Sequence, residues 1–276
     1  MGVELIIGFI LLGMFVGVMA GLLGIGGGGI LVPVLTSIFI YQGFPKDSIM
    51  HIALGTSMAC IAFTSFSSMW SHHQNDAVIW PLAKTMSIGM VIGTFSATFL
   101  VAYLSSKVLA IFFAVFMAYV SIQMFNSKQT TFNKQSIHQT ELRFVTLGIG
   151  GISALVSIAG GSLTVPYLAW RGIDIRKAIG TSAALGFAIS IAGTLGYLIN
   201  GTLNSNTANT IATNASTTQY TLGYIYFPAV LLVAIPSFFT APLGAKLTQR
   251  LPVQILKKIF GVLLMILSLK MAISFI

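Results

Sequence analysis

Residues 21–33 read Gly-Leu-Leu-Gly-Ile-Gly-Gly-Gly-Gly-Ile-Leu-Val-Pro, a cluster of glycines inside a long apolar run. From Val3 to Tyr41 the only ionisable side chain before the tyrosine is that of Glu4. Glycine costs about 1 kcal/mol relative to alanine in a helix interior, so the cluster predicts an interrupted helix. Within a membrane, irregular backbone is tolerated only where protein or a water-filled cavity satisfies its amides.

The composition of the whole chain indicates a membrane protein. Of 276 residues, 56% are hydrophobic and 7% are charged, and the mean hydropathy is +0.93. Soluble domains average about 25% charged residues, which argues strongly against a soluble domain. The net charge is +9, and the basic residues sit in short connections, as in cytoplasmic loops. This charge needs no nucleic-acid partner, and the single cysteine, Cys60, excludes a disulfide framework.

The apolar runs predict ten helical segments, several of which reach the roughly 20 residues that a crossing requires. No segment shows the period-two alternation of a membrane barrel, so strands are not expected. The first segment lacks the basic start of a signal peptide and is interpreted as a retained membrane helix. The expected segments are 3–23, 29–41, 49–70, 78–103, 107–125, 144–159, 162–170, 177–199, 223–247 and 253–275.

The ten segments form two sets of five, and the two sets are an internal repeat. Broken apolar segments in corresponding halves of a membrane protein are a pointer to a transporter binding site. The second copy of the glycine cluster is thinner, with Ser157 facing Gly24. The matched positions are Gly27 with Gly160, Gly28 with Gly161, Pro33 with Pro166, Gly55-Thr-Ser57 with Gly180-Thr-Ser182, and Trp80-Pro81 with Phe227-Pro228.

The repeat predicts a division into two transmembrane units. Residues 1–125 form the first repeat, 126–142 a basic cytoplasmic linker, and 143–276 the second repeat, which carries a polar outer loop at 200–222. Five crossings in each half, an odd number, would invert the second half relative to the first. The fold class is therefore an all-α polytopic membrane protein with two inverted repeats, broken or short helices, and 8–10 transmembrane segments.

The charges of the loops test this orientation. With five crossings per half, the basic connections share one side, the uncharged loop 200–222 lies on the other, and both termini are outside. If the short segments 29–41 and 162–170 re-entered without crossing, the halves would be parallel, and the basic linker would share a side with loop 200–222. Loop charge favours inversion.

Glycines and hydroxyls of both halves form the candidate substrate site. Consecutive glycines exceed what close helix packing requires, although packing remains an alternative explanation. Hydroxyls and free N–H groups at a helix start suit an anion, because the helix dipole is positive there. Membrane-helix hydroxyls that bond their own helix are the competing interpretation. The candidate residues are Gly26, Gly27, Gly28, Gly29, Thr56, Ser57, Gly160, Gly161, Ser162, Thr181 and Ser182.

Other chemistry finds little support in the sequence. The pattern Gly24-x-Gly26-x-x-Gly29 formally matches a dinucleotide fingerprint, but it lacks the βαβ context that this fingerprint requires. The adjacent pair His72-His73 is weak evidence for a metal site. Acidic residues fall in predicted connections, which argues against a cation pump, and no acid–base grouping indicates an enzyme. We expect no cofactor and no metal.

The glycine element Gly21 to Pro33, the Ala-Gly-Gly-Ser-x-x-Val-Pro element of Ala159 to Pro166, and the two Gly-Thr-Ser elements resemble the sulfite exporter TauE/SafE family. The resemblance covers essentially the whole chain. It implies a multi-pass permease of the cell inner (cytoplasmic) membrane for a small anion, such as sulfite or an organosulfonate. We predict alternating access between the repeats, with the anion and the lipid bilayer as partners. An anion channel of the same architecture and a non-transporting membrane assembly subunit are the alternatives.

Overall fold

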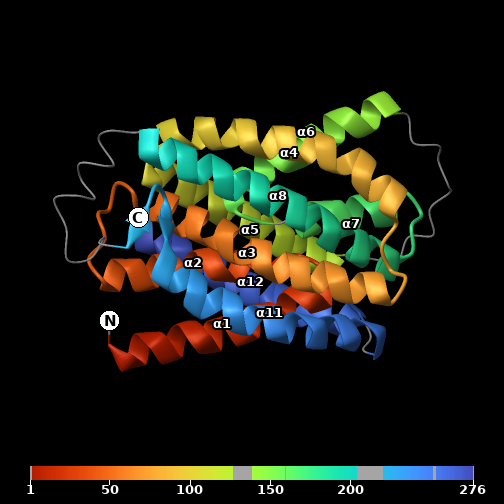
Figure 1. The fold of residues 1–276 in the computed structure, drawn as a ribbon, viewed down its shortest axis with the longest axis horizontal. Helices are drawn as coiled ribbons and strands as arrows, with labels where there is room; N and C mark the ends of the chain where they lie inside the picture. Colours follow the sequence, from red (N-terminus) through yellow and green to blue (C-terminus); the bar gives the residue numbers. More distant parts are fainter. Residues whose placement is uncertain (1, 127–138, 159, 204–219, 251–252, 276) are drawn as a thin grey trace.

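The computed structural model describes residues 2–126, 139–158, 160–203, 220–250 and 253–275. Nearly all of them lie in helices that follow the long axis of one bundle (Figure 1), and the start of α1 and the end of α12 lie at the same end of it. The elements are α1 (Val3–Leu23), α2 (Gly28–Tyr41), α3 (Ile49–Gln74), α4 (Trp80–Tyr103), α5 (Ser106–Asn126), α6 (Gln139–Val156), α7 (Gly161–Trp170), α8 (Ile175–Leu203), β1 (Thr221–Leu222), β2 (Ile225–Tyr226), α11 (Phe227–Arg250) and α12 (Val253–Phe275).

Two helices form the centre of the bundle. In their most apolar windows, 83% of the residues of α3 and 61% of those of α8 are buried, against 39% or less in α1, α4, α5 and α11. The outer helices expose large apolar side chains such as Leu11, Ile88 and Leu231. An apolar exterior around a buried central pair is the arrangement that a bilayer favours.

The lengths of the helices agree with a membrane protein. Within the described part of the chain, six helices are long and apolar enough to cross a membrane, namely α1, α3, α4, α5, α8 and α11. By contrast α2 is about 21 Å long and α7 about 15 Å, while the hydrocarbon layer is about 30 Å thick. The predicted all-α polytopic class with broken or short helices is confirmed, and the short segments are half-length helices.

Backbone conformation explains where α1 and α2 are separated. Gly24, Gly26 and Gly27 all have positive φ, at 65°, 75° and 83°. Glycine adopts this region without the steric cost that a Cβ imposes, so the cluster ends one helix and starts the next. The second break, between α6 and α7, uses Ser157 at φ 49° and Gly160 at φ 70°.

Equivalent central helices of the two halves run in opposite directions. Gly55 of α3 lies against Tyr197 of α8, whereas Met58, further along α3, lies against Gly193, which precedes Tyr197. The helices α3 and α8 are therefore antiparallel.

A short hairpin departs from the expected helix 223–247. The strands β1 and β2 pair Thr221 with Tyr226, and Gly223 makes the turn at φ 57°. Two-residue strands carry no periodicity that a sequence could show. As a consequence α11 begins at Phe227, while most of the predicted loop 200–222 and of the linker 126–142 lies outside the described residues.

One end of the bundle carries most of the charge. The helices α3 and α11 end there, and α4, α6, α8 and α12 begin there (Figure 1). We call it the basic end, and we call the end where α1 begins the opposite end. The charged residues whose side chains are described at the basic end are Asp76, Lys84, Glu141, Arg143, Arg171, Asp174, Arg176, Lys177, Lys246 and Lys258.

Candidate functional site

The two helix breaks contact each other. A Cβ atom on Gly28 would lie less than 3.0 Å from the backbone oxygen of Ser157. Reciprocally, a Cβ atom on Gly161 would lie less than 3.0 Å from the backbone oxygen of Gly24. Because the repeat pairs Gly24 with Ser157 and Gly28 with Gly161, these are one contact made twice. The first turn of α2 thus lies against the break between α6 and α7, and the first turn of α7 lies against the break between α1 and α2.

The remaining predicted glycines have different neighbours. Gly27, just before α2, lies against Val16 of α1, so the start of α2 is close to α1. Gly29 lies against Met117 of α5. Gly160 is the residue before α7 and its Cβ position is near Ile189. In this conformation the glycines allow close approach between parts of the protein itself, and a ligand contact remains a prediction.

Two serine hydroxyls bind the breaks to the central helices. Ser182 of α8 donates a hydrogen bond to the backbone oxygen of Gly24 at 3.0 Å. Ser157 of the second break donates to the backbone oxygen of Leu54 in α3, also at 3.0 Å. Each break is therefore fixed to a central helix of the other half.

The threonines of the two Gly-Thr-Ser elements fix the start of a helix in the other half. Thr56 accepts a hydrogen bond from the backbone N–H of Tyr226, next to the start of α11, at 3.0 Å. Thr181 accepts one from the backbone N–H of Ile79, next to the start of α4, also at 3.0 Å. The repeat pairs Ile79 with Tyr226, so these two contacts are reciprocal as well.

Three hydroxyls near the breaks are buried without a hydrogen-bond partner. They belong to Ser57 of α3 and to Ser162 and Thr164 of α7. A buried polar group without a partner costs about 1–3 kcal/mol, so such groups are expected where a ligand or water supplies the missing bond. Of the predicted hydroxyls, Ser57 and Ser162 are therefore open to a ligand, whereas those of Thr56, Thr181 and Ser182 already bond protein.

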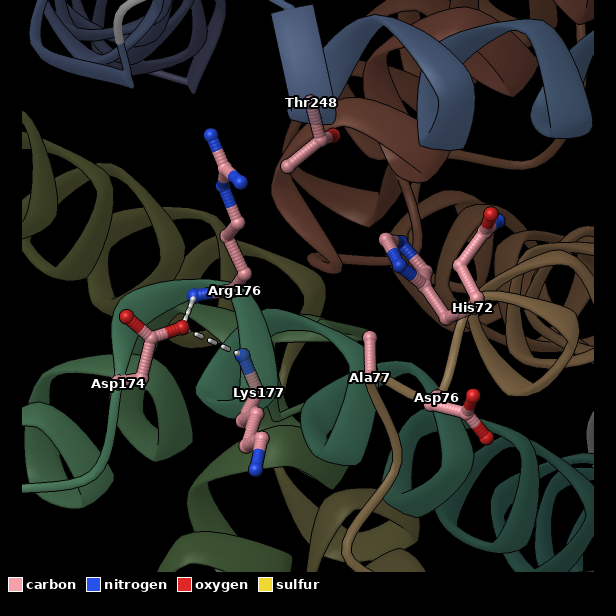
Figure 2. Close-up of a pocket in the computed structure, with 8 residues that line it drawn as sticks. His72, Asp76, Ala77, Asp174, Arg176, Lys177 and Thr248 are labelled. Atoms are coloured by element: carbon pink, nitrogen blue, oxygen red, sulfur yellow. Dashed lines mark hydrogen bonds between the residues drawn. The ribbon is translucent and has the colours of Figure 1, made fainter.

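A cavity of about 280 Å³ at the basic end was not anticipated from the sequence. It lies where α3 and α11 end and α8 begins (Figure 2). From the sequence, His72 is weak evidence for a metal site, and Arg176 is one of the charges of a basic connection. The only signal in the sequence is that the repeat pairs Ala77 with Tyr224, and the structure is needed to show that both residues abut an equivalent glycine. The lining residues are His72, Asn75, Asp76, Ala77, Asp174, Arg176, Lys177 and Thr248.

Metal chemistry finds no support in the described ranges, where no three His, Cys, Asp or Glu side chains are grouped to hold an ion. His72 instead hydrogen-bonds through Nε2 to the backbone oxygen of Gly21 at 3.0 Å. His73 accepts a hydrogen bond from the indole N–H of Trp80. The two adjacent histidines thus have separate structural partners.

Comparison with known proteins gives a consistent set of similarities. A family model described as sulfite exporter TauE/SafE matches residues 9–271. A probable membrane transporter protein of Haemophilus influenzae is 34% identical over 95% of this chain and 96% of its own length. Another probable membrane transporter protein, from Methanocaldococcus jannaschii, is 30% identical over 95% of this chain and 93% of its own. No solved structure matches the chain.

Proposed function

We propose that this chain, which belongs to the sulfite exporter TauE/SafE family of membrane transporters, carries a small sulfur-containing anion such as sulfite or an organosulfonate. Transport proceeds by alternating access between the two halves. The membrane is the cell inner membrane, with the basic end facing the cytoplasm, because cytoplasmic connections carry the excess of Lys and Arg.

The meeting of the two breaks beside unpartnered hydroxyls is the observation that carries this proposal. The helices α2 and α7 begin at Gly28 and Gly161, and the first N–H groups of a helix have no intrahelical acceptor. Ser57 and Ser162 add buried hydroxyls without a partner. N–H groups at helix starts together with hydroxyls are donors that bind oxyanions. The site therefore suits an anion bound without a charged side chain.

The reciprocal contacts between the halves support alternating access. Inverted repeats place a substrate site at the interface of the repeats and rock about it. The antiparallel packing of α3 and α8 supports such an inversion of the two halves in the membrane. The hydrogen bonds from Tyr226 to Thr56 and from Ile79 to Thr181 join one half to the other, so they are the contacts that a rocking motion would change.

The position of the acidic residues bears on the driving force. Glu4, Asp47, Asp76 and Asp174 lie at helix ends or in connections, and Glu141 forms an ion pair with Arg171 at the basic end. Proton relays within a membrane normally use buried carboxylates. We therefore attribute the driving force to the membrane voltage or to entry of a protonated substrate.

The test is sulfite binding and sulfite flux with the purified protein in detergent and in proteoliposomes. Ser57→Ala and Ser162→Ala should each weaken binding by about tenfold or more, because a hydrogen bond to a charged group contributes about 1.5–3 kcal/mol. Ser153→Ala is the matched control, since that buried hydroxyl donates to Ile149 within its own helix. Unchanged affinity in both site variants would remove the hydroxyls from the site.

The same experiment separates the alternative functions. A transporter shows saturable flux and counterflow, and its thermal unfolding temperature rises with sulfite, because a ligand that binds only the folded state stabilises it. An anion channel would show flux that neither saturates nor supports counterflow. A membrane assembly subunit would show neither flux nor a thermal shift with any sulfur-containing anion.

A further inference from the structure

The two ends of the bundle contain equivalent positions that are occupied differently. The repeat that pairs Gly55 with Gly180 also pairs Tyr197 with His72. The two side chains make equivalent bonds, because Tyr197 donates to the backbone oxygen of Ala154 at 2.7 Å and His72 bonds that of Gly21. Each side chain thus holds the last turn of the helix that precedes a break. Differences around them are therefore differences between the two ends.

At the opposite end the space beside Tyr197 is filled. The ring of Tyr224 stacks on His51 with centroids 5.0 Å apart and meets the ring of Tyr197 edge-on at 6.4 Å. All three side chains are buried, with exposed fractions of 4% or less. His51 is bonded in turn to the backbone oxygen of Val101. This aromatic cluster closes the end of the bundle where α1 begins.

At the basic end the equivalent positions leave a cavity. Ala77 takes the position of Tyr224, and its backbone oxygen abuts Gly180 as that of Tyr224 abuts Gly55. Arg176 takes the position of His51. A methyl group therefore stands where the other end has a phenol ring, and it lines the cavity of about 280 Å³. Since a water molecule takes up about 30 Å³, the cavity has room for a small oxyanion and several waters.

The cavity has a buried floor and an exposed, charged rim. His72 and Thr248, each 2% exposed, form the floor, and they bond the backbone oxygens of Gly21 and Leu22 in the last turn of α1. The floor therefore lies directly before the first break. Arg176 is exposed on the rim.

The charges on the rim are not equivalent. In Figure 2 the side chain of Arg176 extends to the same side as Thr248, whereas Lys177 extends the opposite way and the carboxylate of Asp76 points away from Arg176 and Thr248. Asp174 accepts hydrogen bonds from the backbone N–H groups of Arg176, at 2.9 Å, and of Lys177, which hold its carboxylate at the start of α8. The cationic group that faces the cavity is thus that of Arg176.

We propose that this cavity is an anion-binding vestibule at the basic end, in which the guanidinium of Arg176 holds a small oxyanion above the floor of His72 and Thr248. The site is separate from the one between the breaks, and it requires only that the cavity binds anions, whether or not the chain transports them. The aromatic cluster at the opposite end is its closed counterpart.

Chemical labelling of Ala77→Cys tests the vestibule directly. The single natural cysteine, Cys60, is buried, so the wild type gives the background. Purified protein is treated with a negatively or a positively charged methanethiosulfonate, and sulfate is added as the competing anion. The anionic reagent should react faster by on the order of tenfold, since a charged cleft concentrates ions of opposite sign, and sulfate should slow it.

The adjacent cationic residues Arg176 and Lys177 provide two variants that remove the same charge. In the Ala77→Cys background, Arg176→Gln should bring the ratio of the two rates close to one, whereas Lys177→Gln should preserve it. An equal fall in both variants would assign the preference to diffuse surface charge and overturn the proposal. Absence of labelling, or faster labelling by the cationic reagent, would also overturn it. Sulfite flux is not a readout here, so failure of this test leaves the function proposed above separately testable.

Discussion

The two halves of the molecule share their close backbone contacts but only some of their side-chain hydrogen bonds. Both breaks place a helix start against the break of the other half, and both Gly-Thr-Ser threonines accept an amide hydrogen bond from the other half. The serines differ. Ser182 bonds the backbone oxygen of Gly24, whereas its equivalent Ser57 has no partner, and the oxygen of Ser157 lies against Gly28.

This difference shows how a repeated scaffold can produce an unsymmetrical site. Close backbone contacts constrain the positions of the chain, so both halves retain them. A single hydroxyl contact is weaker, at about 1 kcal/mol, so one such as that of the serine can be lost in one half without loss of the fold. The hydroxyl of Ser57 therefore has no partner in the first half, whereas the equivalent hydroxyl of Ser182 is bonded to Gly24, and the proposed anion site uses this difference.

Gly28→Ala should produce the largest effect. Its Cβ atom would overlap the backbone oxygen of Ser157, and backbone cannot move aside as a flexible side chain can. Overpacking typically costs 1–3 kcal/mol, and a clash with backbone should exceed about 3 kcal/mol, so little folded protein should be recovered. The measurement is thermal unfolding and gel filtration in detergent.

Gly148→Ala is the control for this substitution. Gly148 lies in α6 with no atom within 4 Å of its Cβ position, so alanine there should be neutral or stabilising by up to about 1 kcal/mol. If Gly28→Ala unfolded at the temperature of the control, the two breaks would not be in contact in the folded protein.

Exchanging the residues that differ between the breaks should give unequal losses. Gly24→Ser places a side chain at φ 65° with its Cβ atom 2.6 Å from the backbone oxygen of Ile179, which should cost about 2–4 kcal/mol. Ser157→Gly removes the bond to Leu54 but also relieves a non-glycine residue at φ 49°, so the two effects should nearly cancel, leaving less than about 1 kcal/mol. Thermal unfolding of both variants measures the difference, and equal losses would show that the breaks are interchangeable.

Much of the fold could be predicted from the sequence. The helix limits 3–23 and 253–275 agree with α1 and α12, because long apolar runs of helical length have few alternatives in a membrane. The break after Leu23 could also be predicted, since the glycines that cause it are local in the sequence. The hairpin at 221–226 could not, because it depends on pairing across a single turn.

The hydrogen-bond and packing partners of the candidate residues could not be predicted from the sequence. The sequence places Thr56 beside a glycine and a serine, but its acceptor role depends on Tyr226, which is 170 residues away. The vestibule likewise depends on a comparison between Ala77 and Tyr224, which becomes meaningful only once the structure shows that both abut an equivalent glycine. Contacts between halves are set by packing, and a single sequence does not contain them.

The last pair of variants, Thr56→Val and Thr181→Val, tests whether the two ends differ in solvent access. Valine has nearly the shape of threonine but cannot accept a hydrogen bond. The N–H of Tyr226 is buried at the closed end, so Thr56→Val should cost about 2 kcal/mol. The N–H of Ile79 is only partly buried and lies near the vestibule, where water can replace the lost acceptor, so Thr181→Val should cost about 1 kcal/mol.

Thermal unfolding of the two variants is compared with that of Thr36→Val, whose buried hydroxyl donates to Val32 in its own helix and leaves no amide unpaired when it is removed. A larger loss for Thr56→Val than for Thr181→Val would support one sealed end and one hydrated end. Equal losses would mean that the amide of Ile79 is as well sealed as that of Tyr226. The difference between the ends would then be confined to the ring of Tyr224, and the vestibule would stop short of the start of α4.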